Sequence, residues 1–338
     1  MGVDISELVY REQVSLKGYE NRVMAVDAFN ILYQFLSSVR QADGTPLMDS
    51  KGRVTSHLSG CFYRNINLLE NGIRPVFVFD GKPSRLKANT IRERMEVKER
   101  AREELEIARE KGDLERVRSL SARVTYLTKD MVEDVKQLLT ALGIPYIQAP
   151  SEGEGQASYM CRTGQAYGVI SQDYDCLLFG ASRVFRNFTT GGRRKVPGRN
   201  IYVPVSPELL ILEDTLSRNE ITYDQLIDIG IMVGTDFNTG LARVGAKTAL
   251  KLVKKYGNIE TVLKERGEVI ENLEEIKDIF RKQNVIETPP ITFGKPDTEQ
   301  IRRILCDDHD FDPARVDPYI TLAREKMSRN IQTSLDGF

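Results

Sequence analysis

A chain of 338 residues, 41% of them hydrophobic, can build one large domain or two smaller ones around a substantial core. Its 48 basic and 49 acidic residues leave a formal net charge of only −1, so a surface for a polyanion must come from local segregation of charge. Four widely spaced cysteines and two histidines argue against a disulfide framework and a structural zinc site. We therefore expect a protein of a reducing, intracellular compartment.

The first 80 residues alternate between strand-like and helix-like segments. RVMAVD and VFVFD are short, valine-rich runs bounded by turn residues, as in buried strands. Helical periodicity runs through FNILYQFLSSV and LSGCFYRNINLLENG, and a hairpin or loop is expected at ADGTPLMDSKGRVTS. This pattern is typical of βαβ units.

From Lys82 to about Lys129 the composition changes to arginine, lysine and glutamate with few large apolar residues, and a break falls at Lys111-Gly112-Asp113. Such a segment predicts two charged helices that project from the domain. The globular pattern resumes with a helix at MVEDVKQLLTALG and a strand at IPYIQA, and the strands GVISQDYD, SRVFRNF and NIYVPV continue the same sheet to about residue 205. Beyond residue 205 we expect mostly helix, beginning with ELLILEDTL. No run is apolar enough to span a bilayer, so no membrane partner is expected.

Acidic residues follow several of the predicted strands. In an open α/β sheet, ligands bind outside the carboxyl ends of the strands, so acids placed there meet in space. Carboxylates so close together raise one another's pKa unless a cation neutralises them, and magnesium prefers such hard oxygen ligands. The candidate metal ligands are Asp27, Asp80, Glu152, Glu154, Asp173, Asp175 and Asp236.

Each acid alone has an ordinary explanation. An aspartate after a strand commonly caps a helix or forms a turn, and two acids spaced by two residues are commonly solvated. Asp236, in IMVGTDF, alone resembles a turn residue. The coincidence of three strand ends with an acidic turn, in a chain poor in histidine, favours the metal site.

Four ordered motifs carry a family resemblance: FDGKP, PSEGEGQA, QDYDCLLFG, and VGTDF followed by GAKTALKLVKKYG. In this order and spacing the chain resembles the flap structure-specific endonuclease family over essentially its whole length. The resemblance implies an α/β fold with a central, mostly parallel twisted sheet flanked by helices (a PIN-like 5′ nuclease core), a helical arch and a C-terminal helical region. A monomer is expected.

The expected division follows from the same resemblance. Residues 1–81 and 131–205 would form the two parts of the nuclease core, and 82–130 the arch. Residues 206–325 would form a helical DNA-binding region with a helix–two-turn–helix module at about 234–256, and 326–338 a tail.

The resemblance implies two magnesium ions in the active site, with manganese as a substitute. The acids that match the two ions are Asp80, Glu152 and Glu154 for one and Asp173, Asp175 and Asp236 for the other. Asp27 matches an acid that acts largely through bound water. Asp27 and Asp80 are thus expected to be catalytic as well as metal-binding.

Two cations are expected beside the acids. Lys87 and Arg94 lie seven residues apart, on one face of the predicted helix, and match the basic pair that the family uses against the scissile phosphate. The alternative is a solvated helix face, which suits neighbours such as Arg100. Arg123 is a weaker candidate for a DNA contact.

Other positions match the family's DNA contacts. Tyr33 matches an aromatic that stacks on a base beside the cut, although a core tyrosine is nearly as plausible from the pattern alone. Gly2 matches an N-terminus that approaches the active site after Met1 is removed. The lysines of the helix–two-turn–helix module, expected to grip duplex backbone beside a possible potassium ion, are Lys247, Lys251, Lys254 and Lys255.

The chain departs from the family pattern in two places. Arg243 stands where the family usually has glycine, which puts the loop shape and the potassium ligation in question. Gly153 and Gly155 replace commoner alanines and are expected to loosen their turn.

The tail resembles a motif that binds a sliding clamp, the proliferating-cell nuclear antigen. Its matching residues are Gln332, Leu335 and Phe338, spaced by three. The usual second aromatic is absent, and a polar tail with incidental apolar residues is the alternative. The short tail suggests an archaeal protein of the cytoplasm or nucleoid, whereas a eukaryotic one would be nuclear.

The expected function is a magnesium-dependent 5′ flap endonuclease with 5′–3′ exonuclease activity on nicked or gapped duplex, acting in replication, including Okazaki fragment processing, and in repair. Two alternatives remain. One is a non-catalytic protein that binds DNA junctions, and the other is a small-molecule metallophosphatase that uses the same acids.

Overall fold

The computed structural model describes residues 2–41, 44–124, 126–190, 192–195 and 202–335. Within these ranges it does not describe the side chains of residues 114, 118, 122–123, 193–195, 202 and 328–335. Every helix among the described residues is too short or too polar to cross a membrane.

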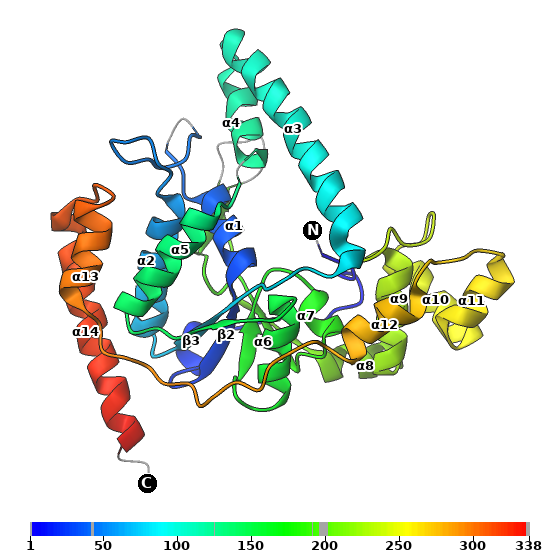
Figure 1. Cartoon of the computed structure of the whole chain (residues 1–338). Coiled ribbons are helices and arrows are strands. Elements are labelled where there is room, and N and C mark those ends of the chain that lie inside the picture. The colour runs from blue at the N-terminus through cyan, green and yellow to red at the C-terminus, as the bar shows by residue number, and fades with distance from the viewer. Residues whose placement is uncertain (1, 42–43, 125, 191, 196–201, 336–338) are drawn as a thin grey trace.

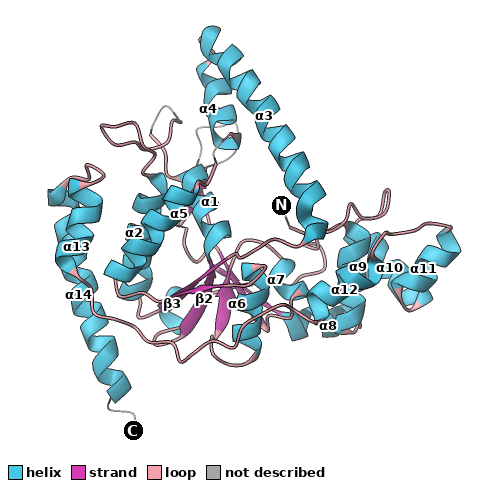
Figure 2. Ribbon diagram, viewed as in Figure 1, coloured by secondary structure: helices cyan, strands magenta, loops and turns pink. Residues whose placement is uncertain are grey.

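A sheet lies at the centre of the molecule, surrounded by helices (Figure 2). It has seven strands in the order β1-β9-β6-β5-β2-β3-β4. Its strands are β1 (Glu12–Gln13), β2 (Val23–Asp27), β3 (Arg74–Phe79), β4 (Tyr146–Gln148), β5 (Gly168–Ile170), β6 (Arg183–Arg186) and β9 (Glu208–Ile211). Neighbouring strands from β6 to β4 pair in parallel, whereas β9 and β1 pair antiparallel at one edge. This confirms the predicted mostly parallel sheet.

The sheet is covered by helices on both faces because its strands are apolar on both sides. In β2, Met24 and Val26 belong to one buried cluster and Ala25 to the other. The first cluster is closed by α1 (Ala28–Ser38), α2 (Ser56–Glu70), α5 (Lys129–Ala141), α13 (Thr298–Arg302) and α14 (Pro313–Leu335). The second is closed by α6 (Gly153–Arg162), α7 (Asp175–Leu178), α9 (Tyr223–Val233), α10 (Ala246–Tyr256), α11 (Ile259–Arg266) and α12 (Leu273–Arg281).

The charged segment forms a helical hairpin that projects from the body (Figure 1). A short 3₁₀ turn, η2 (Arg85–Lys87), leads into α3 (Ala88–Glu110), and α4 (Leu114–Arg123) returns beside it. The two helices share only a small apolar seam, formed mainly by Ala101, Leu105, Ala108 and Leu120. The base of α3 stands beside the N-terminus, above the sheet (Figure 1).

Two sequence-based expectations for residues 202–211 are wrong. Residues 208–211 were expected in a helix but form strand β9, because Leu209 and Leu210 are buried against β6 and a short apolar run fits either structure. Strand β8 (Tyr202–Pro204) was expected in the main sheet but pairs with β7 (Arg193–Lys195) as a separate two-stranded ribbon. The helix α8 (Leu212–Asn219) begins directly after β9.

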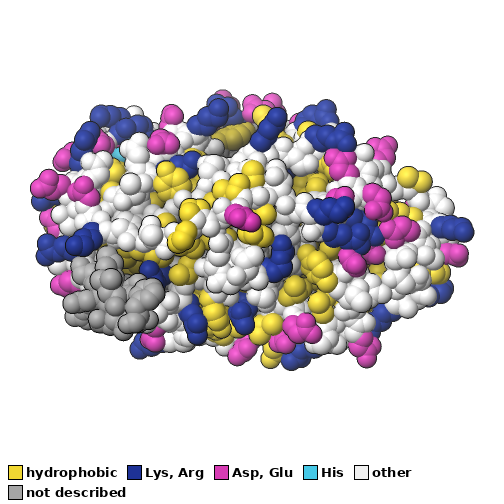
Figure 3. Space-filling view, turned by 60° about the horizontal axis from the view of Figure 1, so that its bottom comes forward, with side chains coloured by type: hydrophobic (Ala, Val, Ile, Leu, Met, Phe, Trp, Pro, Cys, Tyr) yellow, Lys and Arg dark blue, Asp and Glu magenta, His cyan; other side chains and the backbone are white. Residues whose placement is uncertain are grey.

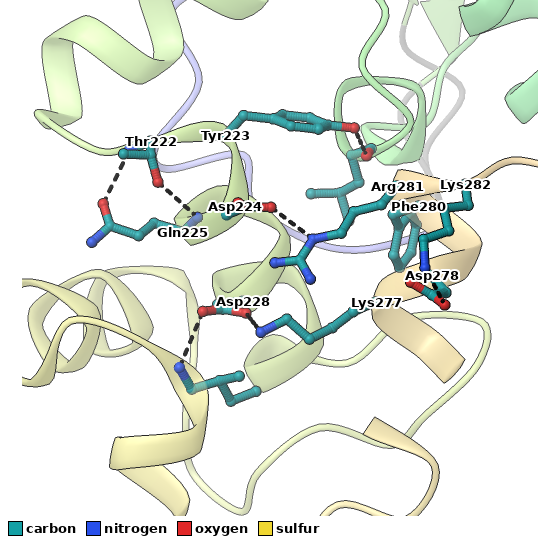
Figure 4. Close-up of polar contacts among 12 residues, drawn as sticks. Thr222, Tyr223, Asp224, Gln225, Asp228, Lys277, Asp278, Phe280, Arg281 and Lys282 are labelled. Atoms are coloured by element: carbon teal, nitrogen blue, oxygen red, sulfur yellow. Dashed lines mark hydrogen bonds and ion pairs between the residues drawn. The ribbon is translucent and has the colours of Figure 1, made fainter. Parts of the chain in front are cut away.

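The helical region after β9 is held by a buried ion pair. The Lys277 Nζ on α12 lies 2.9 Å from the Asp228 carboxylate on α9, and both side chains are buried (Figure 4). Asp228 also accepts a hydrogen bond from the backbone N–H of Ile259 at the start of α11. One acid thus connects three helices.

A strap of extended chain, residues 282–297, leads from α12 to α13, η3 (Arg303–Asp307, a π-helical turn) and α14 (Figure 1). Gln156 exchanges two hydrogen bonds with the backbone of Ile286, and the Gly294 N–H donates to the Gly143 carbonyl. Figure 3 shows the lower side of the molecule, where lysines, arginines and acids are interspersed among the residues drawn in colour. That side presents no continuous basic surface within the coloured residues.

Candidate active site

The parallel pairing of β3, β2 and β5 brings three acidic strand ends together. Asp27 ends the central strand β2, Asp80 follows β3, and residues 171–175 follow β5. Asp27 is buried, accepts a hydrogen bond from the Asn30 N–H at the start of α1, and accepts another from the Ser171 hydroxyl at 3.0 Å. Its helix-capping role, one of the two explanations for this acid, therefore coexists with a place in the acidic pocket.

Asn30 fixes the position of the third strand end. Its side-chain amide donates to the Asp173 carboxylate at 2.9 Å and accepts from the Gln172 N–H. The Ser171 hydroxyl accepts from the Asp173 N–H while donating to Asp27. Sequence reasoning missed Asn30 and Ser171, whose only signal was their place beside the acidic strand ends.

The glycine-rich turn that contains Glu152 and Glu154 starts α6 directly against Asp80. The Gly153 N–H donates to the Asp80 carboxylate at 2.6 Å. A Cβ on Gly153 would lie 2.6 Å from that oxygen, so the absence of a side chain permits this close approach. Gly153 thus permits a tight contact, whereas the sequence suggested only a loosened turn. At Gly155 an added Cβ would meet Phe179 at ordinary distance.

The N-terminal segment closes another side of the pocket. The Val3 N–H donates to Asp175 at 2.8 Å. A Cβ on Gly2 would lie 2.1 Å from the second oxygen of the same carboxylate. Gly2 therefore lies at the acids, where the family resemblance placed it.

The arch supplies the cations. The Lys87 Nζ lies 2.5 Å from the Glu152 carboxylate and 3.3 Å from that of Asp236. Arg94, two turns further along α3, pairs with the other oxygen of Asp236. The Thr90 hydroxyl also donates to the Asp236 carbonyl. The base of α3 is thus held to the loop after α9.

Burial and mutual repulsion raise the pKa values of several carboxyl groups in the pocket. Burial, reinforced by the charge of Asp80, raises the pKa of Asp27 to about 7. Burial also raises the pKa of Asp175 to about 7, with further contributions from Asp173 and Asp236. The pKa of Glu154 is raised well above its ordinary value, by burial and then by the charges of Asp175 and Asp27.

The remaining shifts follow the same physics. Burial raises the pKa of Asp80 although Lys87 opposes the change. Burial alone would lower the pKa of Lys87, but the carboxylates of Glu152 and Asp236 raise it overall. All seven predicted acids interact electrostatically with at least one other member of the set, so the structure brings them into one pocket.

The donor set fits a hard divalent cation. Every candidate ligand is a carboxylate, and the raised pKa values record excess negative charge that such an ion would neutralise. One buried oxygen, Glu152 Oε1, has no hydrogen-bond partner among the described residues. Among the described residues, no three or more of these side chains are already arranged to coordinate one metal ion. Instead, Lys87 and Arg94 form ion pairs with Glu152 and Asp236.

The predicted DNA contacts are spread over three regions. Tyr33, on α1, is 41% exposed and faces the arch, and is thus not a core tyrosine. The Arg123 side chain lies outside the described residues. On α10, Lys251 and Lys255 are exposed, while the module's other two lysines form surface ion pairs, Lys247 with Glu7 and Lys254 with Glu220.

Two further predictions concern backbone shape and the tail. Arg243 has φ of 61°, so the loop keeps a left-handed residue there although glycine is absent. Gln332 and Leu335 fall within α14, but their side chains and all of Phe338 lie outside the described residues.

Comparisons with known proteins agree over the whole chain. The XPG N-terminal domain model matches residues 3–101 and the XPG I-region model residues 143–236. Flap endonuclease 1 of Picrophilus torridus is 49% identical over 100% of both chains. The structure of flap endonuclease-1 from Methanococcus jannaschii has a TM-score of 0.79 at 41% identity, covering 97% of this chain and 99% of that one. The catalytic core of Rad2 in complex with DNA substrate shares the fold, with a TM-score of 0.70 at 24% identity over 93% and 96% of the two chains.

Proposed function

Because this chain belongs to the flap endonuclease 1 family and is therefore a nuclease that hydrolyses phosphodiester bonds, we propose that it cuts DNA at the junction between a 5′ single strand and a duplex. One observation carries the proposal. Acids from three strand ends, the α6 turn and the loop after α9 meet in a pocket whose cations, Lys87 and Arg94, come from the projecting hairpin. A small-molecule phosphatase has no need of such a hairpin.

The chain's own residues have separable roles in this proposal. The acids would hold two magnesium ions, which would supply activation of the attacking water and stabilisation of the leaving oxygen. Lys87 and Arg94 place fixed positive charge beside the position of the scissile phosphate. Gly2, which has no side chain, lets the N-terminal segment lie directly against the Asp175 carboxylate without displacing it.

The duplex side is proposed to bind to α10 and the loop before it. Lys247, Lys251 and Lys254 are exposed along α10 and can contact phosphates without reading sequence. Manganese as a substitute in the active site, a potassium ion in the loop at Arg243, and binding of a sliding clamp through the tail are further proposals that rest on the family resemblance.

A single assay tests the function. A double-flap DNA labelled at its 5′ end is incubated with magnesium and wild type, Asp175→Ala or Lys87→Ala. We expect wild type to release the flap, and each variant to lose about 10²–10³-fold or more in rate. Binding without cleavage by wild type would favour the junction-binding alternative. Indifference to DNA, together with hydrolysis of a small phosphate ester, would favour the phosphatase.

A further inference from the structure

Three side chains from separate segments meet where the arch passes over α1. The Lys98 Nζ lies 5.0 Å from the centroid of the Tyr33 ring and 4.8 Å from that of the Tyr126 ring. Tyr33 belongs to α1, Lys98 to α3, and Tyr126 to the segment that follows α4. The two tyrosines are among the more exposed aromatic side chains, at 41% and 39%.

The contacts of the Lys98 ammonium group with the two rings are weak enough for another group to displace it. Cation–π contacts at partly exposed sites are weak, and burial, followed by the charge of Arg94, lowers the pKa of Lys98. A hydrogen bond with the backbone of Leu127 fixes the Tyr33 hydroxyl, and with it ties α1 to the segment that carries Tyr126. The two aromatic rings are thus held near each other without packing into the core.

The position of this group relative to the acids is also informative. Lys98 lies one helical turn beyond Arg94 on the same face of α3. Because Arg94 contacts Asp236, Lys98 lies one turn further along the arch than the residue that reaches the acids. The Tyr33 hydroxyl lies close enough to the acids for the charge of Asp80 to act on its pKa. A single strand that left the acids along α3 would therefore reach Lys98 and the rings of Tyr33 and Tyr126.

We propose that Tyr126 is a second stacking residue for the bases of the single-stranded part of a DNA substrate, beside Tyr33. In the free protein, Lys98 covers its ring, and a base replaces the ammonium when the strand enters. Every base offers a π face, so this contact is independent of sequence. The inference rests on the proposed function, because it concerns the strand that the nuclease would cut.

The test compares two DNAs that differ only in the single strand. A nicked duplex and the same duplex with a short 5′ flap carrying 2-aminopurine are titrated with protein in EDTA, so that the DNA stays intact. We expect Tyr126→Ala to weaken binding of the flapped DNA about 5- to 100-fold relative to the nicked duplex and to reduce quenching of the 2-aminopurine. Tyr126→Phe keeps the ring and should retain both.

The variant Lys98→Met distinguishes the contribution of the Tyr126 ring from that of the Lys98 charge. It keeps the apolar stem and removes the charge, so flap binding should stay equal or strengthen because the rings are easier to reach. A loss in Lys98→Met as large as in Tyr126→Ala would overturn the proposal, since the cation would then be the contact. Equal weakening of both DNAs by Tyr126→Ala, or failure of Tyr126→Phe, would also overturn it. Cleavage of a double flap by wild type, measured in parallel with magnesium, shows whether the proposed function itself holds.

Discussion

Replacing Asp175 with asparagine should stabilise the metal-free protein at neutral pH. The carboxyl group is buried and its pKa of about 7 compares with an ordinary 3.8. At 1.36 kcal/mol per pKa unit, this corresponds to roughly 4 kcal/mol of unfavourable free energy when the group is ionised. Because neighbouring acids share this repulsion, we expect the variant to recover about 2–4 kcal/mol. Asparagine can still accept the hydrogen bond from the Val3 N–H.

The sign of the pH dependence follows from proton binding. Between about pH 4 and pH 7 the folded protein keeps a proton on Asp175 that the unfolded chain has lost. The free energy of unfolding must therefore fall as the pH rises through this window, and the full penalty remains above it. Urea denaturation in EDTA at several pH values measures this for wild type and Asp175→Asn. Plotted against pH, the free energies of unfolding of wild type and Asp175→Asn should converge near pH 4 and separate towards pH 8.

A matched control and the addition of magnesium complete the design. Glu271→Gln removes an exposed carboxylate from the turn before α12 and should leave the pH dependence unchanged. Magnesium should stabilise wild type at pH 8 by mass action, and should stabilise Asp175→Asn less. Identical denaturation curves for wild type and Asp175→Asn at pH 8 in EDTA would refute the reasoning.

Three further predictions address other parts of the molecule. Gly2→Ala places a Cβ 2.1 Å from a carboxylate oxygen of Asp175 and should slow flap cleavage by at least about tenfold in the cleavage assay. The control Gly18→Ala, which has open space around the new Cβ, should leave the rate of cleavage unchanged. Lys277→Met leaves the buried Asp228 without its cation and should lower the free energy of unfolding, measured by urea denaturation, by about 3–5 kcal/mol. Adding Asp228→Asn to this variant should restore part of the loss. Lys251→Ala should weaken duplex binding and reduce the slope of log affinity against log salt by about 1 in a salt titration.

Sequence could predict the acidic pocket because one physical rule generates it. Parallel strands end at one edge of a sheet, so acids that follow β2, β3 and β5 must come close to one another. The strands and the amphipathic helices were also predictable, because each buries apolar residues at the spacing of its own structure. The mostly parallel sheet was therefore predictable from local patterns together with family resemblance.

The rest depends on contacts that no local pattern encodes. Strand β9 was mistaken for helix because its apolar run is short, and only pairing with β6 decides its structure. Asn30 and Ser171 look like ordinary polar residues until Asp27 and Asp173 are brought beside them. The grouping of Lys98 with two tyrosines likewise needs three segments to meet, since their sequence separation carries no signal.

The packing of α14 has a consequence for how the protein is made. Val316, Ala323 and Met327 are buried in the cluster that also holds Met24 and Val26 of the central strand. Helices α1, α2 and α5 can cover part of this cluster early in synthesis, but the part that contacts α14 is covered only when the last helix has been made. Until α14 has been synthesised and released, the uncovered part of the cluster is an apolar surface to which chaperones can bind.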